Sequence, residues 1–147
     1  MSKNIIVLIS LLIFSNGWSQ SEEYQKEKAE KIKKGSVFTK IINRELRATI
    51  VYEDDELIAF VPLRKQAPVH YLIVPKKEIY TINDMTEEDT MLIGKLFIVA
   101  KKLAKENGIS ETGYRLSMNN NEDAGQSVFH LHLHLMGGEE LGPMVTQ

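Results

Sequence analysis

The sequence contains no cysteine, and this absence excludes disulfides, zinc–thiolate sites and thiol nucleophiles. No apolar run approaches the ~20 residues that a membrane-spanning helix needs. Neither sign of charge dominates, since 18 basic and 20 acidic side chains leave a formal net charge of −2, and this balance gives no support for a nucleic-acid partner. What remains is a chain of 147 residues with the composition of a soluble globular protein, and its length predicts a single folded domain.

The N-terminal stretch MSKNIIVLISLLIFSNGWSQ has the layout of a secretory signal. A lysine precedes an apolar run from Ile5 to Phe14, and Gly17 and Ser19 are small residues placed for cleavage before Gln20. We therefore predict that residues 1–19 are a signal peptide and that the mature protein is exported, periplasmic or secreted, without stable membrane insertion. The alternatives are an uncleaved anchor or a buried N-terminal helix, and without a functional signal the protein would be cytoplasmic.

Residues 20–35 are charged and rich in helix-forming residues, which predicts an exposed helix or a mobile lead-in that ends at Gly35. The remaining residues, 36–147, are predicted to form one domain. Short β-prone runs bounded by turn residues indicate antiparallel strands, and a longer run with helical periodicity indicates one helix packed on the sheet. This combination is an α+β fold. The expected strands are 47–54, 56–62, 68–77, 114–119 and 128–136, and the expected helix is 85–108.

The stretch GQSVFHLHLHLMGG, from Gly125 to Gly138, contains three of the chain's four histidines. Side chains alternate between the two faces of a strand, so every second residue of this segment is expected to face the core and the residues between them are expected to face the opposite side. From a rise of ~3.3 Å per residue, neighbouring histidines are expected about 6.6 Å apart and the outer two about 13 Å apart. The expected core side is Phe129, Leu131, Leu133 and Leu135, and the expected opposite side is Val128, His130, His132, His134 and Met136.

Three imidazoles on one face indicate a functional site, for which two kinds of chemistry compete. In a metal site, two imidazoles at this spacing share an ion, but the third would have to bend far inward, and His70 is the only other histidine. In a phosphoryl or nucleotidyl site, one neutral imidazole is the nucleophile and its neighbours donate hydrogen bonds to phosphate oxygens. The second kind is favoured because Gly125, Gln126 and Ser127 bring backbone N–H groups, an amide and a hydroxyl next to the row.

The segment HLHLHLM matches the His-x-His-x-His-x-x pattern of the histidine triad (HIT) superfamily. A second segment, QAPVHYLIVPKK from Gln66 to Lys77, resembles a signature of its Hint branch, the histidine triad nucleotide-binding proteins. The resemblance runs from about Val37 to Gly138. It implies a HIT-like α+β fold, a homodimer, and hydrolysis of nucleoside phosphoramidates or related small-molecule nucleotide substrates at the α-phosphorus, with no metal or other cofactor.

The resemblance also implies roles for individual residues. His132 matches the nucleophile that forms a nucleotidyl-histidine, and His130 matches the residue whose backbone carbonyl orients the nucleophilic ring. His134 matches a histidine that binds phosphate and stabilises the transition state, Ser127 matches a contact to the phosphate and leaving group, and His70 matches a fourth histidine that supports the triad. Substrate contacts are expected from Gly125 and Gln126, and from Asn119 near the phosphate and ribose. An apolar pocket for the base is expected from Val37, Phe38, Ile41, Leu46, Phe60 and Leu72. These six apolar residues would also suit an ordinary hydrophobic core.

The chain departs from the Hint pattern where the substrate is recognised. Val61 and Pro62 stand where the pattern has a histidine and an aspartate, and that aspartate contacts the ribose hydroxyls. Proline has no acceptor side chain, and a ribose without this contact loses about 1–3 kcal/mol of binding. The C-terminal EELGPMVTQ also lacks the tryptophan- and proline-rich ending of many Hint proteins. The alternative to a hydrolase is therefore a phosphate- or nucleotide-binding module that has lost turnover or changed its ligand.

Overall fold

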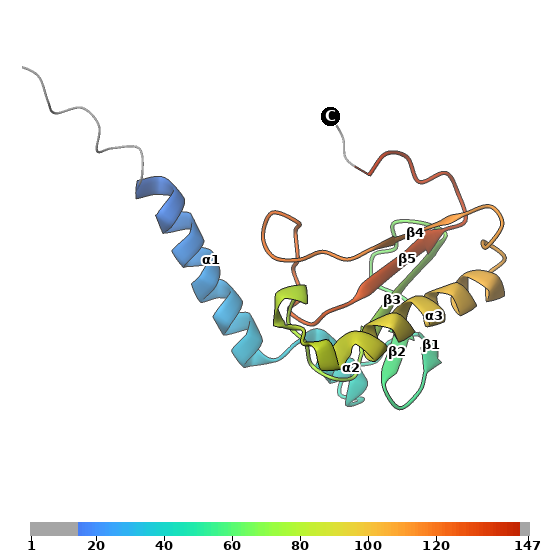
Figure 1. Cartoon of the computed structure of the whole chain (residues 1–147), viewed down its shortest axis with the longest axis horizontal. Helices are drawn as coiled ribbons and strands as arrows, with labels where there is room; N and C mark the ends of the chain where they lie inside the picture. The colour runs from blue at the N-terminus through green and yellow to red at the C-terminus, as the bar shows by residue number, and fades with distance from the viewer. Residues whose placement is uncertain (1–14, 145–147) are drawn as a thin grey trace, which may run out of the picture.

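The computed structural model describes residues 15–144 of the chain (Figure 1). Residues 1–14, most of the predicted signal peptide, lie outside this range, as do residues 145–147. The described residues form a five-stranded antiparallel sheet in the order β1-β2-β3-β5-β4, with helices on it, which confirms the predicted α+β fold. The strands are β1 (Ile50–Glu53), β2 (Leu57–Phe60), β3 (Val69–Pro75), β4 (Tyr114–Ser117) and β5 (Leu133–Gly137), the helices are α1 (Ser15–Lys34), α2 (Val37–Ile42) and α3 (Thr90–Glu106), and two 3-10 turns cover Ile82–Asp84 and Glu87–Asp89.

Helix α3 covers one face of the sheet and forms the larger part of the core. Its buried positions recur every three or four residues, which is the periodicity of one helix face. Alternate residues of the strands meet this face, because successive side chains of a strand point to opposite sides. The residues that pack together are Leu96, Val99, Ala100, Leu103 and Ala104 of α3 and Leu57, Ala59, Ile73, Leu133 and Leu135 of the strands.

Helix α2 covers part of the opposite face with a second, smaller apolar cluster. Phe38 and Ile41 of α2 are its helical members. The strand residues beneath them are Ile58, Phe60, Leu72 and Val74. Since β2 meets an apolar layer on each side, all four of its residues are buried. His134 of β5 lies opposite Leu72 of β3 in the register, and so it belongs to this second face.

Strand β5 is shorter than predicted and begins only at Leu133. Its pairing with β3, continued by two more residues in the observed register, would bring Leu131 opposite Pro75. Proline has no N–H to donate to a neighbouring strand, and the Leu131 N–H donates to Ile79 O at 2.6 Å instead. The first two histidines therefore precede the strand, and the prediction of one strand over 128–136 that carries three histidines on one face is wrong.

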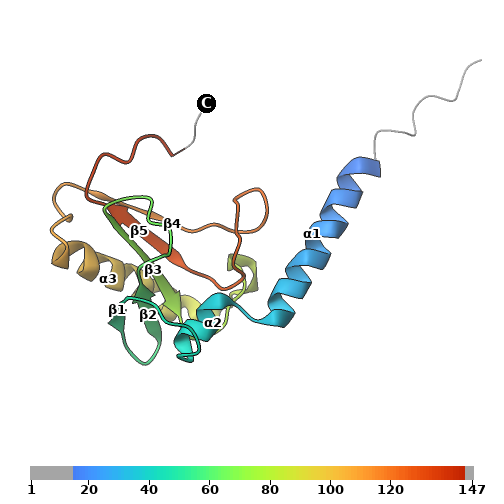
Figure 2. The same cartoon turned by 180° about the vertical axis from the view of Figure 1, so that it is seen from behind.

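The predicted N-terminal helix is present as α1, which ends before Gly35, a glycine with a φ of 74°. Figures 1 and 2 show α1 extending away from the domain, with only its C-terminal part close to the sheet and its loops. Over residues 15–144, no helix has both the length and the apolar character needed to cross a membrane.

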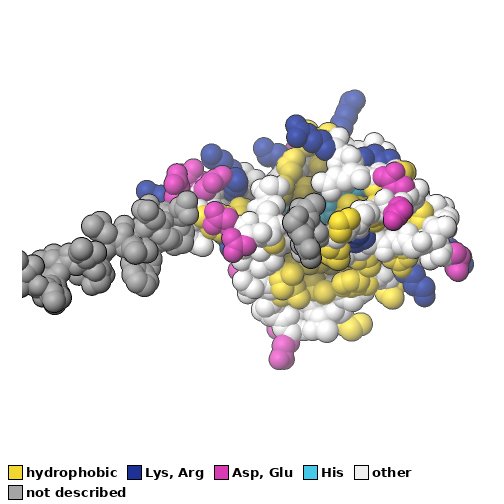
Figure 3. Space-filling model, turned by 90° about the horizontal axis from the view of Figure 1, so that it is seen from above, with side chains coloured by type: hydrophobic (Ala, Val, Ile, Leu, Met, Phe, Trp, Pro, Cys, Tyr) yellow, Lys and Arg dark blue, Asp and Glu magenta, His cyan; other side chains and the backbone are white. Residues whose placement is uncertain are grey.

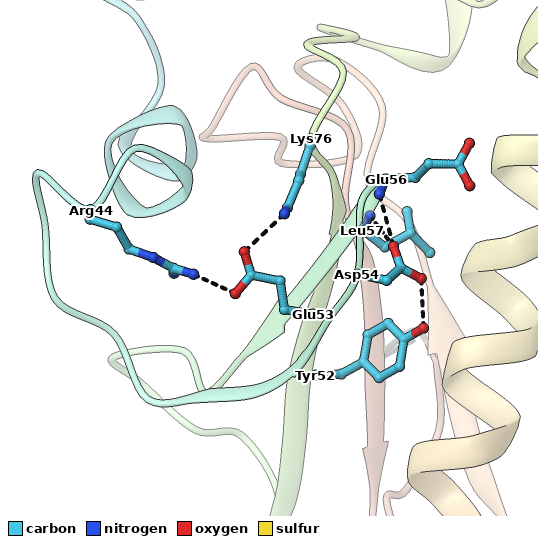
Figure 4. Close-up of polar contacts among 7 residues, drawn as sticks. All are labelled: Arg44, Tyr52, Glu53, Asp54, Glu56, Leu57 and Lys76. Atoms are coloured by element: carbon cyan, nitrogen blue, oxygen red, sulfur yellow. Dashed lines mark hydrogen bonds and ion pairs between the residues drawn. The ribbon is translucent and has the colours of Figure 1, made fainter.

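A polar cluster around Asp54 fixes the turn between β1 and β2 (Figure 4). Asp54 Oδ1 accepts hydrogen bonds from the backbone N–H groups of Glu56 at 2.9 Å and Leu57 at 2.8 Å, and Oδ2 accepts one from the Tyr52 hydroxyl at 2.6 Å. Lys95 Nζ of α3 lies 3.1 Å from the same Oδ2. Burial by itself raises the pKa of the Asp54 carboxyl, but these donors together hold its pKa well below the ordinary value.

Replacing Asp54 by alanine is expected to lower the free energy of unfolding by about 2 kcal/mol, because the Tyr52 hydroxyl and the backbone N–H groups of Glu56 and Leu57 lose this acceptor. The folded pKa is lowered, so this stabilisation is present above the unfolded pKa of about 4 and is lost as the pH falls towards the folded value. Urea denaturation at neutral pH measures the effect. The exposed neighbour Asp55 provides the control, and an Asp55→Ala loss as large as that of Asp54→Ala would contradict the assignment.

Candidate active site

The histidine rings gather beside β3 and β5 on the face that α2 partly covers. His134 lies on β5 and His70 on β3, with ring centroids 5.3 Å apart. His132, just before β5, has its centroid 5.0 Å from that of His134. Figure 3 shows histidine side chains in a hollow of the surface between hydrophobic side chains. Three imidazoles are thus in a row, but they come from two strands and a loop.

His130 is fully buried and fastens α2 to the end of β3. Its Nε2 lies 2.7 Å from Pro75 O, which can only accept, so Nε2 carries the hydrogen. Its Nδ1 then accepts from the Ser36 hydroxyl at 3.0 Å. Ser36 is the N-cap of α2, and its Oγ accepts the Thr39 N–H. Burial lowers the pKa of His130, which keeps the ring neutral. The ring of His130 therefore has a structural role, and its backbone carbonyl is the part that faces His132.

His132 presents a free lone pair because its tautomer is fixed. Nδ1 lies 2.8 Å from His130 O, an acceptor, so the hydrogen is on Nδ1 and Nε2 is unprotonated. The Phe38 ring packs edge-on against the His132 ring with centroids 5.0 Å apart, and the residue is only 7% exposed. Burial lowers the pKa of His132, so the neutral form predominates at neutral pH.

His70 and His134 form a second pair with fixed tautomers. The Gln66 backbone N–H donates to His70 Nδ1 at 3.0 Å, so His70 carries its hydrogen on Nε2. That Nε2 donates to His134 Nδ1 at 3.0 Å, which places the His134 hydrogen on Nε2. Burial, with the neighbouring His132 and His70, lowers the pKa of His134 to about 4. Burial and then the Lys65 charge lower the pKa of His70. His134 is therefore a neutral N–H donor at the pH at which His132 is a neutral base.

The buried histidines predict that the protein loses stability in mildly acidic solution. Their folded pKa values lie below the unfolded value of about 6.5, so the unfolded chain binds protons first as the pH falls. The free energy of unfolding should therefore decrease by about 2 kcal/mol between about pH 6.5 and 4.5, before most carboxylates titrate. Urea denaturation across this range measures it, and an unchanged midpoint would contradict the assigned neutral rings.

The arrangement places one lone pair and one N–H on adjacent rings. The His132 Nε2 lone pair suits attack on an electrophilic phosphorus, and the His134 Nε2–H suits an oxygen that gains negative charge during that attack. The remaining nitrogens of His70, His132 and His134 are hydrogen-bonded to protein groups. In the described part of the chain, no group of three His, Cys, Asp or Glu side chains is placed to hold a metal ion. The site therefore offers a lone pair on one ring beside a hydrogen-bond donor on the next.

The loop before the histidines differs from the expectation at Gly125 and Gln126. The Gly125 N–H donates to Glu122 O at 2.7 Å, and the Gln126 N–H donates to Asn121 O at 3.0 Å, so neither N–H is available to an anion. The buried Gln126 side chain accepts from the Asn121 N–H at 2.8 Å and donates to Tyr80 O at 2.8 Å. These two residues therefore brace the loop through their hydrogen bonds, and their predicted contact with substrate stays a prediction. Ser127 is exposed at the surface of this loop.

The apolar residues predicted for the base pocket divide into two groups. Phe38, Ile41, Phe60 and Leu72 are buried together in the smaller cluster, and Phe38 touches His132. Val37 and Leu46 lie outside this cluster and are 38% and 43% exposed. Asn119, two residues after the end of β4, is also exposed. Phe38, Ile41, Phe60 and Leu72, from α2, β2 and β3, thus form an apolar wall that reaches the His132 ring through Phe38.

Two residues of the site were not predicted from the sequence. Ser36 caps α2 and holds His130, and a serine before the apolar run VFTKII is a recognisable N-cap signal. Gln66 acts through its backbone N–H, which sets the tautomer of His70. No side-chain pattern identifies such a backbone donor, so only the fold could reveal it.

Residues 43–141 match the family model described as the HIT domain. Purine nucleoside phosphoramidase of Escherichia coli (strain K12) is 48% identical to the chain over 111 residues, which cover 76% of this chain and 93% of that protein. An uncharacterised HIT-like protein of a Synechocystis species is 48% identical over 103 residues, which cover 70% and 90% respectively.

Solved structures resemble the fold as well as the sequence. A HIT family hydrolase from Legionella pneumophila superposes with a TM-score of 0.72 at 49% identity, covering 74% of this chain and 96% of that one. A HIT family hydrolase from Clostridium thermocellum has a TM-score of 0.73 at 45% identity, covering 76% and 97%. The family model, the sequence identity and the superposition together show that the chain belongs to the HIT family.

Proposed function

We propose that this HIT-family enzyme hydrolyses nucleoside phosphoramidates or related nucleotides at the α-phosphorus, through a covalent nucleotidyl-histidine. The observation that carries the proposal is the pair of tautomers, with a lone pair on His132 Nε2 beside an N–H on His134 Nε2. The Escherichia coli relative, named a purine nucleoside phosphoramidase, supports the same substrate class.

In the first step, His132 Nε2 attacks the α-phosphorus and the bond from phosphorus to the leaving amine breaks. The amine departs with a proton that the Ser127 hydroxyl relays from water. Positive charge develops on the His132 ring, and the hydrogen bond from its Nδ1 to His130 O strengthens as it does. In the second step water attacks the adduct, the bond from nitrogen to phosphorus breaks, and the neutral ring is restored. The proton that this water loses neutralises the hydroxide left by the first step. Two moderate barriers replace one high barrier.

The nucleoside is expected to lie against the apolar wall that includes Phe38, beside the nucleophilic ring. Pro62 offers the ribose no acceptor at the position where the Hint pattern has an aspartate. We therefore expect weaker ribose recognition than in proteins with the aspartate, by roughly ten- to a hundredfold in affinity. Pro62 is also what favours the second candidate, a phosphate-binding module with an altered ligand.

The test is a substrate panel run with wild type and His132→Ala. Adenosine 5′-phosphoramidate, a dinucleoside polyphosphate and a nucleotide sugar represent three leaving groups. Release of AMP by wild type and not by the variant supports the hydrolase. If wild type turns over none of them, calorimetry with AMP, adenosine and a non-nucleotide phosphate decides for or against the binding module. Binding that needs the phosphate supports the module, and adenosine binding as tightly as AMP contradicts it.

We also propose that residues 1–19 direct export and are removed, on the strength of the charged, apolar and small-residue sections of the N-terminus. Intact-mass spectrometry of the protein from its native host tests this. A mass that begins at Gln20 supports export, and a mass that retains Met1 contradicts it.

A homodimer is the proposed assembly. The outer side of α3 leaves Met91, Phe97 and Ile98 exposed, and β4 is an edge strand of the sheet beside it. Apolar side chains and an open strand edge on one side of a small domain suit a second copy of the chain. Sedimentation at micromolar concentration should give a dimer mass for wild type and a lower mass for Ile98→Glu. A monomer at all concentrations would contradict the assembly.

A further inference from the structure

Over residues 22–34, one side of α1 is partly buried and the other residues are exposed. Tyr24, Lys28 and Ile32 are half-buried, and they recur at the four-residue spacing that places side chains on one helix face. Helix α1 precedes the part of the chain that matches the HIT domain, residues 43–141. The stripe is therefore an addition to the family domain that still makes specific contacts with it.

These contacts fall on both ends of one loop. Lys28 Nζ donates a hydrogen bond to Asn121 Oδ1 at 2.9 Å and lies 5.4 Å from the centroid of the Phe129 ring. The Tyr24 ring packs edge-on against the same Phe129 with centroids 6.3 Å apart. Cation–π and edge-on aromatic contacts of this kind are attractive and depend on geometry. The segment from Asn121 to Phe129 is thus held at its first and last residues by α1.

The same segment carries Ser127 and leads directly into the triad. Asn121, at a φ of 64°, exchanges hydrogen bonds with Gln126 in both directions, through its own N–H and its carbonyl. Gln126 immediately precedes Ser127, and Phe129, only 4% exposed, immediately precedes His130. A shift of Asn121 or Phe129 would therefore move the serine hydroxyl relative to the histidine rings.

We propose that Tyr24 and Lys28 are positioning residues that hold the loop Asn121–Phe129 in the conformation in which Ser127 reaches the leaving group. This inference rests on the proposed function for the role of Ser127. Lys28 supplies the hydrogen bond and the charge, and Tyr24 supplies an apolar ring, since its buried hydroxyl has no hydrogen-bond partner. Both residues follow Gln20, so they stay in the chain whether or not the signal is removed.

The test compares Tyr24→Ala, Lys28→Ala and the double variant with two controls on the same helix. Tyr24→Phe keeps the ring, and Lys26→Ala removes an exposed lysine outside the stripe. With adenosine 5′-phosphoramidate, kcat/KM should fall roughly 5- to 10-fold for each alanine variant, because a smaller fraction of the molecules has the loop in the conformation in which Ser127 reaches the leaving group. Both controls should stay within about twofold, since neither removes a contact.

A leaving-group comparison separates positioning from general destabilisation. Fluoride leaves adenosine 5′-phosphofluoridate without needing a proton, so the alanine variants should hydrolyse that substrate almost as fast as wild type. Equal losses on both substrates, or losses in Tyr24→Phe as large as in Tyr24→Ala, would overturn the proposal.

Hydrogen exchange of residues 119–129 gives a readout that does not depend on catalysis. Exchange in this loop should become faster in the alanine variants and remain unchanged in the controls, while the exchange of β3 and β5 stays as in wild type. If wild type hydrolyses neither substrate, the proposed function fails, but faster loop exchange still shows that α1 holds the loop. Unchanged loop exchange in the double variant overturns the inference itself.

Discussion

His132→Ala is expected to lower kcat at least about 10⁴-fold and so to abolish hydrolysis, because the variant lacks the proposed nucleophile. His132 Nε2 has the lone pair of a ring whose hydrogen is held on Nδ1 by His130 O. No other histidine has a free lone pair, because His70 and His130 are hydrogen-bonded at both nitrogens and His134 carries its free hydrogen on Nε2. The measurement is single-turnover release of AMP from adenosine 5′-phosphoramidate.

Two controls show whether the loss of activity comes from the missing imidazole and not from misfolding or lost binding. His132→Ala should keep the wild-type circular dichroism spectrum and should still bind AMP, because the apolar wall and His134 remain. Added imidazole should restore part of the activity by occupying the space that the ring leaves. Activity within tenfold of wild type without imidazole would exclude His132 as the nucleophile.

His134→Ala is expected to lower kcat about 10²–10³-fold, with a smaller change in KM, since its N–H acts on charge that develops in the transition state. His134→Gln should retain more activity than alanine, because the glutamine amide can present an N–H close to the position of Nε2. A KM effect that exceeds the kcat effect would mean that His134 binds the ground state instead.

The His70 contact provides an internal check on that assignment. His70 acts on the reaction only through His134 Nδ1, so His70→Ala should cost roughly 10- to 100-fold by itself. In the His134→Ala background the same substitution should cost almost nothing further, because the group that it orients is gone. Losses that multiply in the double variant would show that His70 has a separate role.

The overall fold was predictable because its signals are local. Periodic apolar residues in 85–108 indicated α3, and short alternating runs separated by turns indicated the antiparallel strands. The start of β5 was not predictable, because it depends on Pro75, which lies in another strand and becomes relevant only once the register of β3 and β5 is known. The same non-local constraint takes His130 out of the histidine row and buries it.

Residue types were also insufficient to assign the roles of the polar loop. Gly125 and Gln126 have N–H groups that could donate hydrogen bonds to an anion, but in the folded protein these groups donate to acceptors of the protein itself. Val37 and Leu46 are apolar and yet exposed, since a sequence position near a pocket does not decide which way a side chain points. The tautomers of His70 and His134 depend on a backbone N–H from Gln66, and that donor appears only in the folded chain.

The central claim is that a neutral His132 takes the nucleotidyl group. Acid-quenched or rapidly denatured reactions of wild type with adenosine 5′-phosphoramidate, digested and mapped by mass spectrometry, test it most directly. The account predicts an adenylyl group on His132 that appears before AMP is released and is absent from His132→Ala. AMP formed by wild type with no adduct at any reaction time, or with the adduct on another residue, would contradict it.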